Sequence, residues 1–366
     1  MSRVDSLSIR GFKSIRNLQS FFMGNLNVLI GANGAGKSNF ISLFRLLNKM
    51  YEQQLQIFVQ QQGGPDALLH YGRQNTEQLH AEFHFGLNSY DFDLVPTVDN
   101  RLIFAQETSR FKGYFYSTKP SPIILGRGHT KSKLKEAKDK YSHYVRESVS
   151  NWRVYHFHDT SEKAKVKQRH PSNDNLFLKI DAANLAAYLR RIHDENPDAY
   201  QRILSTIRLV APFFGDFVHR LGKTDDLPPE SLELEWTQKG RSDTVLKAHI
   251  LSDGTLRFIS LATLLLQPME WIPDTILIDE PELGLHPFAI SVLAELFQQV
   301  SEHRQLIVST QSVELVNELG PEDIIVVDQV DGASTFRRFE QEELSAWLEE
   351  YALGELWKRN VLGGRP

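Results

Sequence analysis

The chain has 366 residues, of which 41% are hydrophobic and 24% charged, with a formal net charge of −5 and no cysteine. This composition is typical of a globular protein, and the missing cysteines exclude disulfides, thiolate metal sites and cysteine nucleophiles. No apolar run approaches the roughly 20 residues that span a membrane, and the first residues lack the pattern of a signal peptide. We therefore expect a cytoplasmic protein without a membrane partner.

The most informative segment, residues 31–38, reads Gly-Ala-Asn-Gly-Ala-Gly-Lys-Ser. It follows a predicted strand over 26–30 and precedes a predicted helix over 39–50, and an earlier strand is expected over 6–10. Strand, glycine loop and helix is the context of a phosphate-binding loop. The candidate nucleotide-binding residues are Asn33, Gly34, Ala35, Gly36, Lys37, Ser38 and Asn39.

The chemistry of such a loop predicts its ligand. Glycines let successive backbone N–H groups turn toward phosphate oxygens, and the positive end of the following helix dipole faces the same anion. Lys37 is placed to reach the β- and γ-phosphates, and the Ser38 hydroxyl is placed to ligate Mg²⁺. We expect ATP and Mg²⁺ as the bound species.

The next segments change character twice. The helix after the loop is expected to continue into the glutamine-rich stretch 53–62 and to break at 63–65. From 78 to 106, apolar and polar residues alternate with a period of two, which predicts antiparallel strands with one buried face.

Residues 110–170 carry a local excess of positive charge. They hold 15 Lys and Arg against 5 Asp and Glu, a local charge of +10, so the rest of the chain carries −15. Part of this segment, 131–149, is predicted to be a basic helix. Two interpretations stay open: a surface for DNA or another polyanion, or a solvated helix face and its loop.

The second half predicts helices over 184–192 and 197–209 and then an α/β pattern. That pattern comprises helix 255–266, strand 275–278, helix 287–300, strands 305–309 and 323–327, and a helical stretch over 342–359. We divide the chain into an N-terminal ATPase lobe (1–110), a basic, mostly helical insert (111–245), a C-terminal ATPase lobe (246–340) and a helical tail (341–366).

Two carboxylates, Asp279 and Glu280, end the apolar strand of the C-terminal lobe. At the carboxyl end of a parallel strand, Asp279 can hold Mg²⁺ and Glu280 can polarise a water that attacks the γ-phosphate. Ahead of them, Leu-Ser-Asp-Gly-Thr over 251–255 places Ser252 and Gly254 at a predicted helix start. Ser252 is an N-cap candidate there, and a helix start can also bind an anion.

Together, the loop, residues 251–255 and Asp279-Glu280-Pro281 resemble the ATP-binding-cassette (ABC) ATPases. In that family, the Leu-Ser-x-Gly segment of one subunit contacts the γ-phosphate held by the other. The resemblance therefore implies a homodimer with ATP sandwiched at its interface, in which Ser252 and Gly254 act on the partner's nucleotide.

Within this superfamily, three segments resemble the RecF-like, SMC-like and OLD-type ATPases: Ile-Arg-Gly-Phe-Lys-Ser over 9–14, residues 251–257 and residues 278–287. Lys13 matches a basic position near the nucleotide in those families. Residues 154–161, 181–186 and 361–366 also resemble a group of short bacterial ATPases. We expect an α/β fold: an ABC-type, RecF/SMC-like P-loop NTPase head with an antiparallel β lobe and a mostly helical insert.

The resemblance implies a function with a partner. Such ATPases are often encoded beside a nuclease or other effector in anti-phage modules, so we expect an ATP-driven sensor or scaffold subunit. The alternatives are an ATP-bound assembly platform that does not hydrolyse ATP, a RecF-like DNA-repair ATPase and, least favoured, a transporter ATPase.

One residue departs from the family pattern. ABC ATPases usually carry a histidine after the strand that follows the paired carboxylates, and Gln311 occupies that position here. An amide can hydrogen-bond a phosphate oxygen but carries no charge, so hydrolysis is expected to be slow. The glutamine that senses Mg²⁺ in the family is Gln74 or Gln78.

Overall fold

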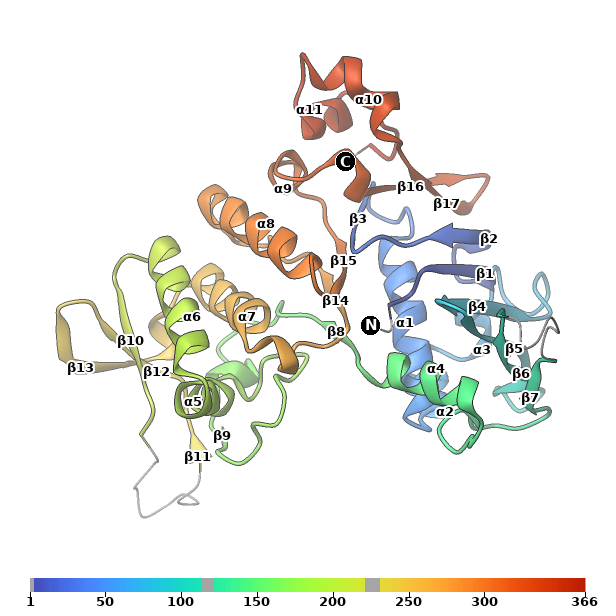
Figure 1. The fold of residues 1–366 in the computed structure, drawn as a ribbon, viewed down its shortest axis with the longest axis horizontal. Coiled ribbons are helices and arrows are strands. Elements are labelled where there is room, and N and C mark those ends of the chain that lie inside the picture. The colour runs from blue at the N-terminus through green and yellow to red at the C-terminus, as the bar shows by residue number, and fades with distance from the viewer. Residues whose placement is uncertain (1–2, 114–120, 221–230, 366) are drawn as a thin grey trace.

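The computed structural model describes residues 3–113, 121–220 and 231–365. Its centre is a sheet with the strand order β17-β16-β3-β15-β14-β8, in which β17 is antiparallel to β16 and the other pairs are parallel (Figure 1). The strands of this central sheet are β3 (Leu26–Ile30), β8 (Trp152–Tyr155), β14 (Thr275–Asp279), β15 (Gln305–Ser309), β16 (Ile324–Val330) and β17 (Ala333–Arg338).

Helices cover both faces of the central sheet, which is why its inner strands are continuous apolar runs. On β3, Leu29 packs into the core that contains α1 (Lys37–Tyr51), while Val28 and Ile30 pack into the core that contains α7 (Asp253–Leu266) and α8 (Pro287–Ser301). Because side chains alternate across a strand, a single run of apolar residues supplies both cores.

An antiparallel sheet with the order β2-β1-β4-β5-β6-β7 packs on the outer side of α1 (Figure 1). It confirms the alternation over 78–106, because Leu79, Ala81 and Phe83 are fully buried. Its strands are β1 (Ser6–Phe12), β2 (Ile15–Phe22), β4 (Leu79–Phe85), β5 (Asn88–Pro96), β6 (Leu102–Phe111) and β7 (Ile123–Gly126), and α2 (Leu55–Gln61) and α3 (Pro65–Leu68) lie beside it.

A second region surrounds α7 at the left of Figure 1. There α7 packs between α6 (Pro197–Val210) and α8, and α5 (Leu185–Glu195) packs on α6. The small strands beside them are β9 (His170–Pro171), β10 (Phe214–Val218), β11 (Ser231–Leu232), β12 (Glu235–Gln238) and β13 (Arg241–Lys247), with the short turns η1 (Lys165–Lys167), η2 (Ala248–Ile250) and η3 (Met269–Trp271).

The C-terminal elements lie at the top of Figure 1: α9 (Val313–Asn317), η4 (Pro321–Asp323), α10 (Gln341–Leu348) and α11 (Leu353–Lys358). The predicted helical stretch over 342–359 consists of two helices, because the chain is extended at Ala352 between them. The helix after the phosphate loop also stops early, at Tyr51, because Gln53 takes a left-handed φ of 64°.

The basic helix predicted over 131–149 is wrong in its first half. The helix there, α4, spans Lys140–Ser150 and starts where the Asp139 side chain accepts a hydrogen bond from the Ser142 N–H. The preceding residues form turns and irregular backbone. The Asp139 carboxylate, as N-cap, fixes the position of the first helical turn.

The four-part division of the chain stays a prediction. The elements of its second part, 111–245, join three neighbourhoods: β7 pairs with β6, α4 packs on α1 and β5, and β8 forms the edge of the central sheet. Residues 114–120 and 221–230 of that part lie outside the described residues. No helix in the described ranges is both long and apolar enough to cross a bilayer.

Candidate functional site

The phosphate loop connects β3 to α1 through three glycines with positive φ: Gly31 (151°), Gly34 (82°) and Gly36 (118°). Two of them also allow close packing. A Cβ on Gly31 would lie 2.1 Å from the Val327 carbonyl oxygen, and one on Gly36 would lie 2.0 Å from Ser334 Oγ. The loop is therefore wedged against the β16–β17 hairpin, and only glycine fits at these positions.

Lys37 begins α1 and is 5% exposed. Its ammonium donates to the carbonyl oxygens of Gly31 and Ala32. Burial lowers the pKa of Lys37, while the negative charges of Glu280 and Asp279 oppose that shift. The lysine is thus held inside the loop, within electrostatic reach of the predicted catalytic carboxylates.

The other predicted loop residues line its open side. Asn33, Gly34 and Ser38 are exposed, so the Ser38 hydroxyl is free to reach a ligand from outside the loop. Asn39 is partly buried because its amide donates to Ser14 Oγ over 2.7 Å. The Ala35 carbonyl accepts from Ser334 Oγ, which fixes the buried side of the loop.

The predicted carboxylates end β14, two strands from β3 in the sheet order. Asp279 Oδ1 is buried and has no hydrogen-bond partner among the residues that the structure describes. An unpaired buried carboxylate oxygen is costly unless a cation or donor meets it, so this atom fits the predicted role as a Mg²⁺ ligand. The next residue, Glu280, takes a left-handed φ of 44°, and its N–H donates to the Ser309 carbonyl over 2.8 Å.

Gln311 follows β15, and its side-chain amide donates to Glu280 Oε1 over 2.5 Å. The residue that departs from the family pattern is therefore in direct contact with the predicted base. Glu282, which the sequence analysis did not select, supports the pair. It accepts from Thr310 Oγ1 over 2.6 Å and from the Gln311 N–H over 2.9 Å, and burial raises the pKa of its carboxyl.

Lys13 lies at the turn between β1 and β2 and bonds to α1 and to the end of α2, with Nζ 2.9 Å from Ser42 Oγ and 2.9 Å from Gln62 Oε1. Burial lowers the pKa of Lys13, and the nearby charge of Arg45 lowers it further. Ser42 is one helical turn beyond Ser38 on α1, so Lys13 sits beside the loop but has protein partners of its own.

Ser252 is the N-cap of α7, as predicted, and its Oγ accepts from the Thr255 N–H over 3.2 Å. It is exposed, and among the described residues it makes no hydrogen bond to the phosphate loop. Gly254 packs against the segment after the carboxylates, since a Cβ there would lie 2.1 Å from the Gly284 carbonyl oxygen. The start of α7 thus packs directly on the segment that follows β14.

Arg257 joins α7 to a second segment. Its guanidinium donates to the carbonyl oxygens of Phe157 and His158 over 2.9 and 3.1 Å, beyond the end of β8. His156 on the same segment has a different partner, since its Nδ1 lies 3.3 Å from Arg45 Nη2. The segment after β8 is therefore tied both to α7 and to α1.

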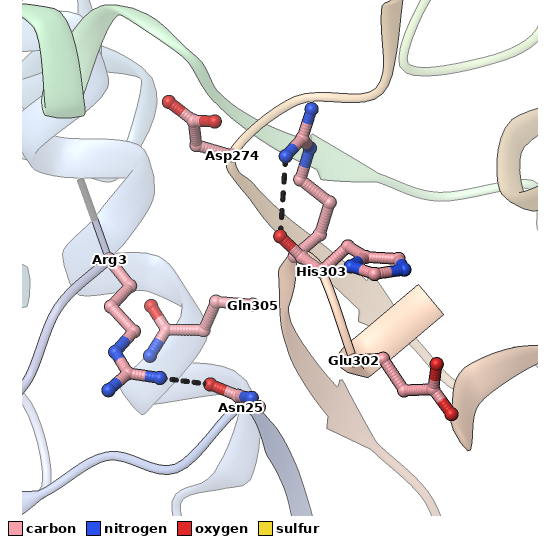
Figure 2. A pocket seen from close by; sticks show the side chains of 7 residues that line it. Arg3, Asn25, Asp274, Glu302, His303 and Gln305 are labelled. Atoms are coloured by element: carbon pink, nitrogen blue, oxygen red, sulfur yellow. Dashed lines mark hydrogen bonds between the residues drawn. The ribbon is translucent and has the colours of Figure 1, made fainter. Parts of the chain in front are cut away.

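A pocket of about 70 Å³ lies elsewhere. Figure 2 shows the side chains that line it, among them Arg3, Asn25, Asp274 and Gln305, where β14 and β15 begin. Ligands of open α/β sheets bind at the carboxyl ends of parallel strands, and this cavity is at the amino ends. Gln305 there bonds to both backbone groups of Val4, which indicates a structural junction.

Comparison with solved structures identifies the fold. The chain is similar to an SMC head bound to the C-winged helix domain of ScpA, at 16% identity over 94% of this chain and 99% of that one, with a TM-score of 0.61. It is also similar to Smc heads from Pyrococcus furiosus (18% identity, 96% and 99% coverage, TM-score 0.56) and Pyrococcus yayanosii (14%, 96% and 99%, 0.54). The fold is that of an ABC-type, SMC-like P-loop ATPase head, as expected.

The family follows from a match over residues 26–317 to the model described as "AAA domain, putative AbiEii toxin, Type IV TA system". The chain belongs to this family of P-loop ATPases. The curated proteins give no match.

Sequence reasoning missed the groups that hold the site in place: Glu282, Ser334, Arg45 and Arg257. Each acts through a contact between segments far apart in the chain, for example Ser334 Oγ with Ser14 Oγ over 2.7 Å. A weak signal existed for Ser14, which ends the segment 9–14, but nothing near Ser334 marks it in the sequence.

Proposed function

We propose that this chain binds ATP with Mg²⁺ and hydrolyses it to ADP and phosphate in a homodimer. The observation that carries the proposal is the convergence at one sheet edge of Lys37, from the loop after β3, with Asp279 and Glu280, from the end of β14. Family membership supports an ATPase, and the roles of individual residues rest on their positions.

In this proposal the backbone N–H groups of 33–39 and the Lys37 ammonium bind the phosphates. Ser38 and Asp279 would hold Mg²⁺, which would neutralise charge on the phosphates. Glu280 takes a proton from a water molecule, and the oxygen of that water forms a bond to the γ-phosphorus. At the same time the bond between the γ-phosphorus and the bridging β–γ oxygen breaks, and ADP leaves. Gln311 orients Glu280 through the 2.5 Å bond between them.

The dimer follows from the place of Ser252 and Gly254. Both lie at the N-terminal turn of α7, where Ser252 is exposed and, within the described part of the chain, has no hydrogen bond to the phosphate loop. A helix start with an N-cap hydroxyl suits a phosphate, so we propose that it binds the γ-phosphate held by the partner chain. Closure of the two chains into a dimer would then depend on ATP. Arg257 and Gly254 would link this closure to the carboxylates of the site.

We further propose that the ATPase works with a separate effector, a nuclease encoded nearby, in a defence module. The family description names a toxin–antitoxin system, which supports a function with a partner. The exposed lysines at 131, 133, 135, 138 and 140 offer a site for DNA or another polyanion.

The test is phosphate release by the wild type and Glu280→Gln, with Glu295→Gln on the exposed face of α8 as the matched control. We expect turnover by the wild type and by the control, and a loss of at least about 100-fold in Glu280→Gln, because one general base contributes on that order. Equal turnover in all three proteins would overturn the assignment of Glu280.

A second function is favoured by the Gln311 contact. The amide occupies an oxygen of Glu280 that would otherwise meet water. If that contact persists with ATP bound, the protein would be an ATP-dependent assembly platform without turnover. ATP-dependent dimerisation without phosphate release by the wild type would support this function.

A further inference from the structure

The end of the chain returns to the phosphate loop. After α11, the backbone turns through positive φ at Asn360 (61°), Gly363 (80°) and Gly364 (58°). The Trp357 indole N–H, fully buried, donates to the Gly364 carbonyl over 2.6 Å. The Gly364 N–H in turn donates to Asp328 Oδ2 over 3.3 Å, just past the buried part of β16. The tail is therefore anchored from two sides.

This anchoring brings Gly364 against the loop itself. A Cβ on Gly364 would lie 2.7 Å from Val326 Cγ1, 2.9 Å from the Val327 carbonyl oxygen and 3.4 Å from Gly31 Cα. A Cβ on Gly31 would also lie too close to the Val327 carbonyl oxygen. The close approach and the positive φ both require glycine at 364. Figure 1 shows the C-terminal end beside β3 and β16.

The contact falls at a particular end of the loop. The Gly31 carbonyl accepts from the Lys37 ammonium, the group that in phosphate loops reaches the β- and γ-phosphates. The tail thus meets the loop where its lysine lies and not at Ser38, where α1 begins. Arg365, the next residue of the tail, is exposed.

The negative charge around Lys37 gives an arginine in the tail a candidate ligand, the bound triphosphate. Three carboxylates, Asp279, Glu280 and Glu282, act on Lys37, and a bound triphosphate adds further negative charge. A guanidinium suits a phosphate because its planar fork donates two parallel hydrogen bonds. The tail carries such a group one residue beyond the contact of Gly364 with Gly31.

We propose that residues 363–365 are part of the nucleotide site and that Arg365 contacts the terminal phosphate of the bound triphosphate. The inference rests on the proposed function, since it needs a nucleotide in the loop. It adds a ligand-binding group from the last residues of the chain. It also explains why Gly364 packs on Gly31 while Trp357 and Asp328 hold it there.

The experiment measures binding of the non-hydrolysable analogue AMP-PNP and of ADP, both with Mg²⁺, to the full chain. Arg365→Ala is compared with Lys358→Ala, which removes an exposed charge from α11 nearby. We expect Arg365→Ala to raise the Kd for AMP-PNP about tenfold and the Kd for ADP less than about twofold, because one charge-assisted hydrogen bond to the terminal phosphate is removed. Lys358→Ala should change neither, and Arg365→Lys should recover most of the AMP-PNP affinity.

Two further variants separate the possible failures. Lys37→Ala tests the loop: if the wild type does not bind AMP-PNP, or binds it no better than Lys37→Ala, the proposed function fails and the tail proposal fails with it. If Lys37→Ala weakens binding but Arg365→Ala matches Lys358→Ala, only the tail proposal is overturned. Gly364→Val should displace the tail and weaken AMP-PNP binding at least as much as Arg365→Ala. Weaker binding in Gly364→Val alone would mean that the tail is a structural clamp, and would overturn the role of Arg365.

Discussion

Glu280 combines two features that are rare for an ordinary surface acid: a left-handed backbone with φ 44° and a 2.5 Å hydrogen bond from the Gln311 amide. Left-handed conformations of non-glycine residues cost free energy and persist where the surrounding structure holds them. Here the Ser309 carbonyl accepts the Glu280 N–H and fixes the peptide. The Gln311 amide and the Ser309 carbonyl therefore hold Glu280 at the edge of the sheet where Lys37 lies.

Removing the amide tests this orientation. We expect Gln311→Ala to lower kcat about 10- to 100-fold with little change in KM, because Glu280 loses its positioning partner and the loop is untouched. Gln329→Ala, at an exposed position of β16, is the control and should behave as the wild type. A kcat that rises in Gln311→Ala would contradict the positioning role and would mean that Gln311 restrains Glu280.

The residue-level site was only partly predictable. Lys37, Ser38, Asp279 and Glu280 lie in short local motifs whose spacing specifies their chemistry, and the structure brings Lys37 within electrostatic reach of both carboxylates. Their supporting groups come from other segments. Glu282 is an example, since its contacts to Thr310 and Gln311 depend on the pairing of β14 with β15 and not on its neighbours in sequence.

Among the elements, α7 and the loop after β14 pack closely on each other. Gly254 is the second residue of α7, where a change from glycine to alanine would ordinarily stabilise a helix by up to about 1 kcal/mol. In this structure the added Cβ would lie 2.1 Å from the Gly284 carbonyl oxygen. The steric cost therefore outweighs the gain in helix propensity.

We expect Gly254→Ala to lower the free energy of unfolding by about 1–3 kcal/mol, the usual cost of overpacking. Urea denaturation without nucleotide measures this. A variant as stable as the wild type, or more stable, would show that α7 and the loop separate freely, and the proposed link between closure and the carboxylates would have no basis.

The turn η4, which leads into β16, carries a partly buried acid, Asp323. Burial, with a smaller contribution from Glu322, raises the pKa of Asp323 to about 6. A raised carboxyl pKa favours folding at low pH, and that contribution disappears as the pH rises through about 6. The ionised form is therefore a net cost to the fold at neutral pH.

Asp323→Asn should accordingly be more stable than the wild type at pH 7, by about 1 kcal/mol once solvent screening is allowed for, and equally stable at pH 4. Unfolding curves at the two pH values test this. Glu342→Gln, at an exposed position of α10, should show no such difference. A gain of equal size at both pH values would exclude the titration of Asp323 as its cause.

Elements with strong periodicity could be predicted from the sequence, and their ends could not. Strands β14 and β15 and helix α8 are found within a residue or two of their expected ranges. The basic helix failed because Asp139 caps a later start, a competition between local signals that composition does not resolve. The small strands β9 and β11 pair across residues far apart in the chain, which no local pattern predicts.

For the whole molecule, the central sheet unites both ends of the chain, with β3 between β15 and β16. The sequence motifs at 31–38 and 279–280 predicted that union, because a phosphate loop and its carboxylates must meet. The order of the remaining strands, and the return of the tail to Gly31, depend on tertiary packing and had no sequence signal.

The proposed polyanion surface includes the segment from Lys131 to Lys140 and can be tested by changing its lysines. The double variant Lys133→Glu and Lys135→Glu should weaken duplex DNA binding and reduce the salt slope by about 1 for each phosphate that the protein no longer neutralises. Lys239→Glu, an exposed lysine in the β12–β13 turn, is the control. Unchanged DNA binding, or none by the wild type, would leave the segment as a solvated surface.

The central claim is that two chains close around ATP, and the solution mass of Glu280→Gln tests it most directly. We predict that Glu280→Gln is a dimer with ATP and Mg²⁺ and a monomer with ADP. When Ser252→Arg is added, we predict a monomer with ATP as well, because that change places a bulky cation at the proposed contact. Ser345→Arg on α10 is the control and should still form the dimer. A mass that does not respond to ATP in Glu280→Gln would contradict the claim.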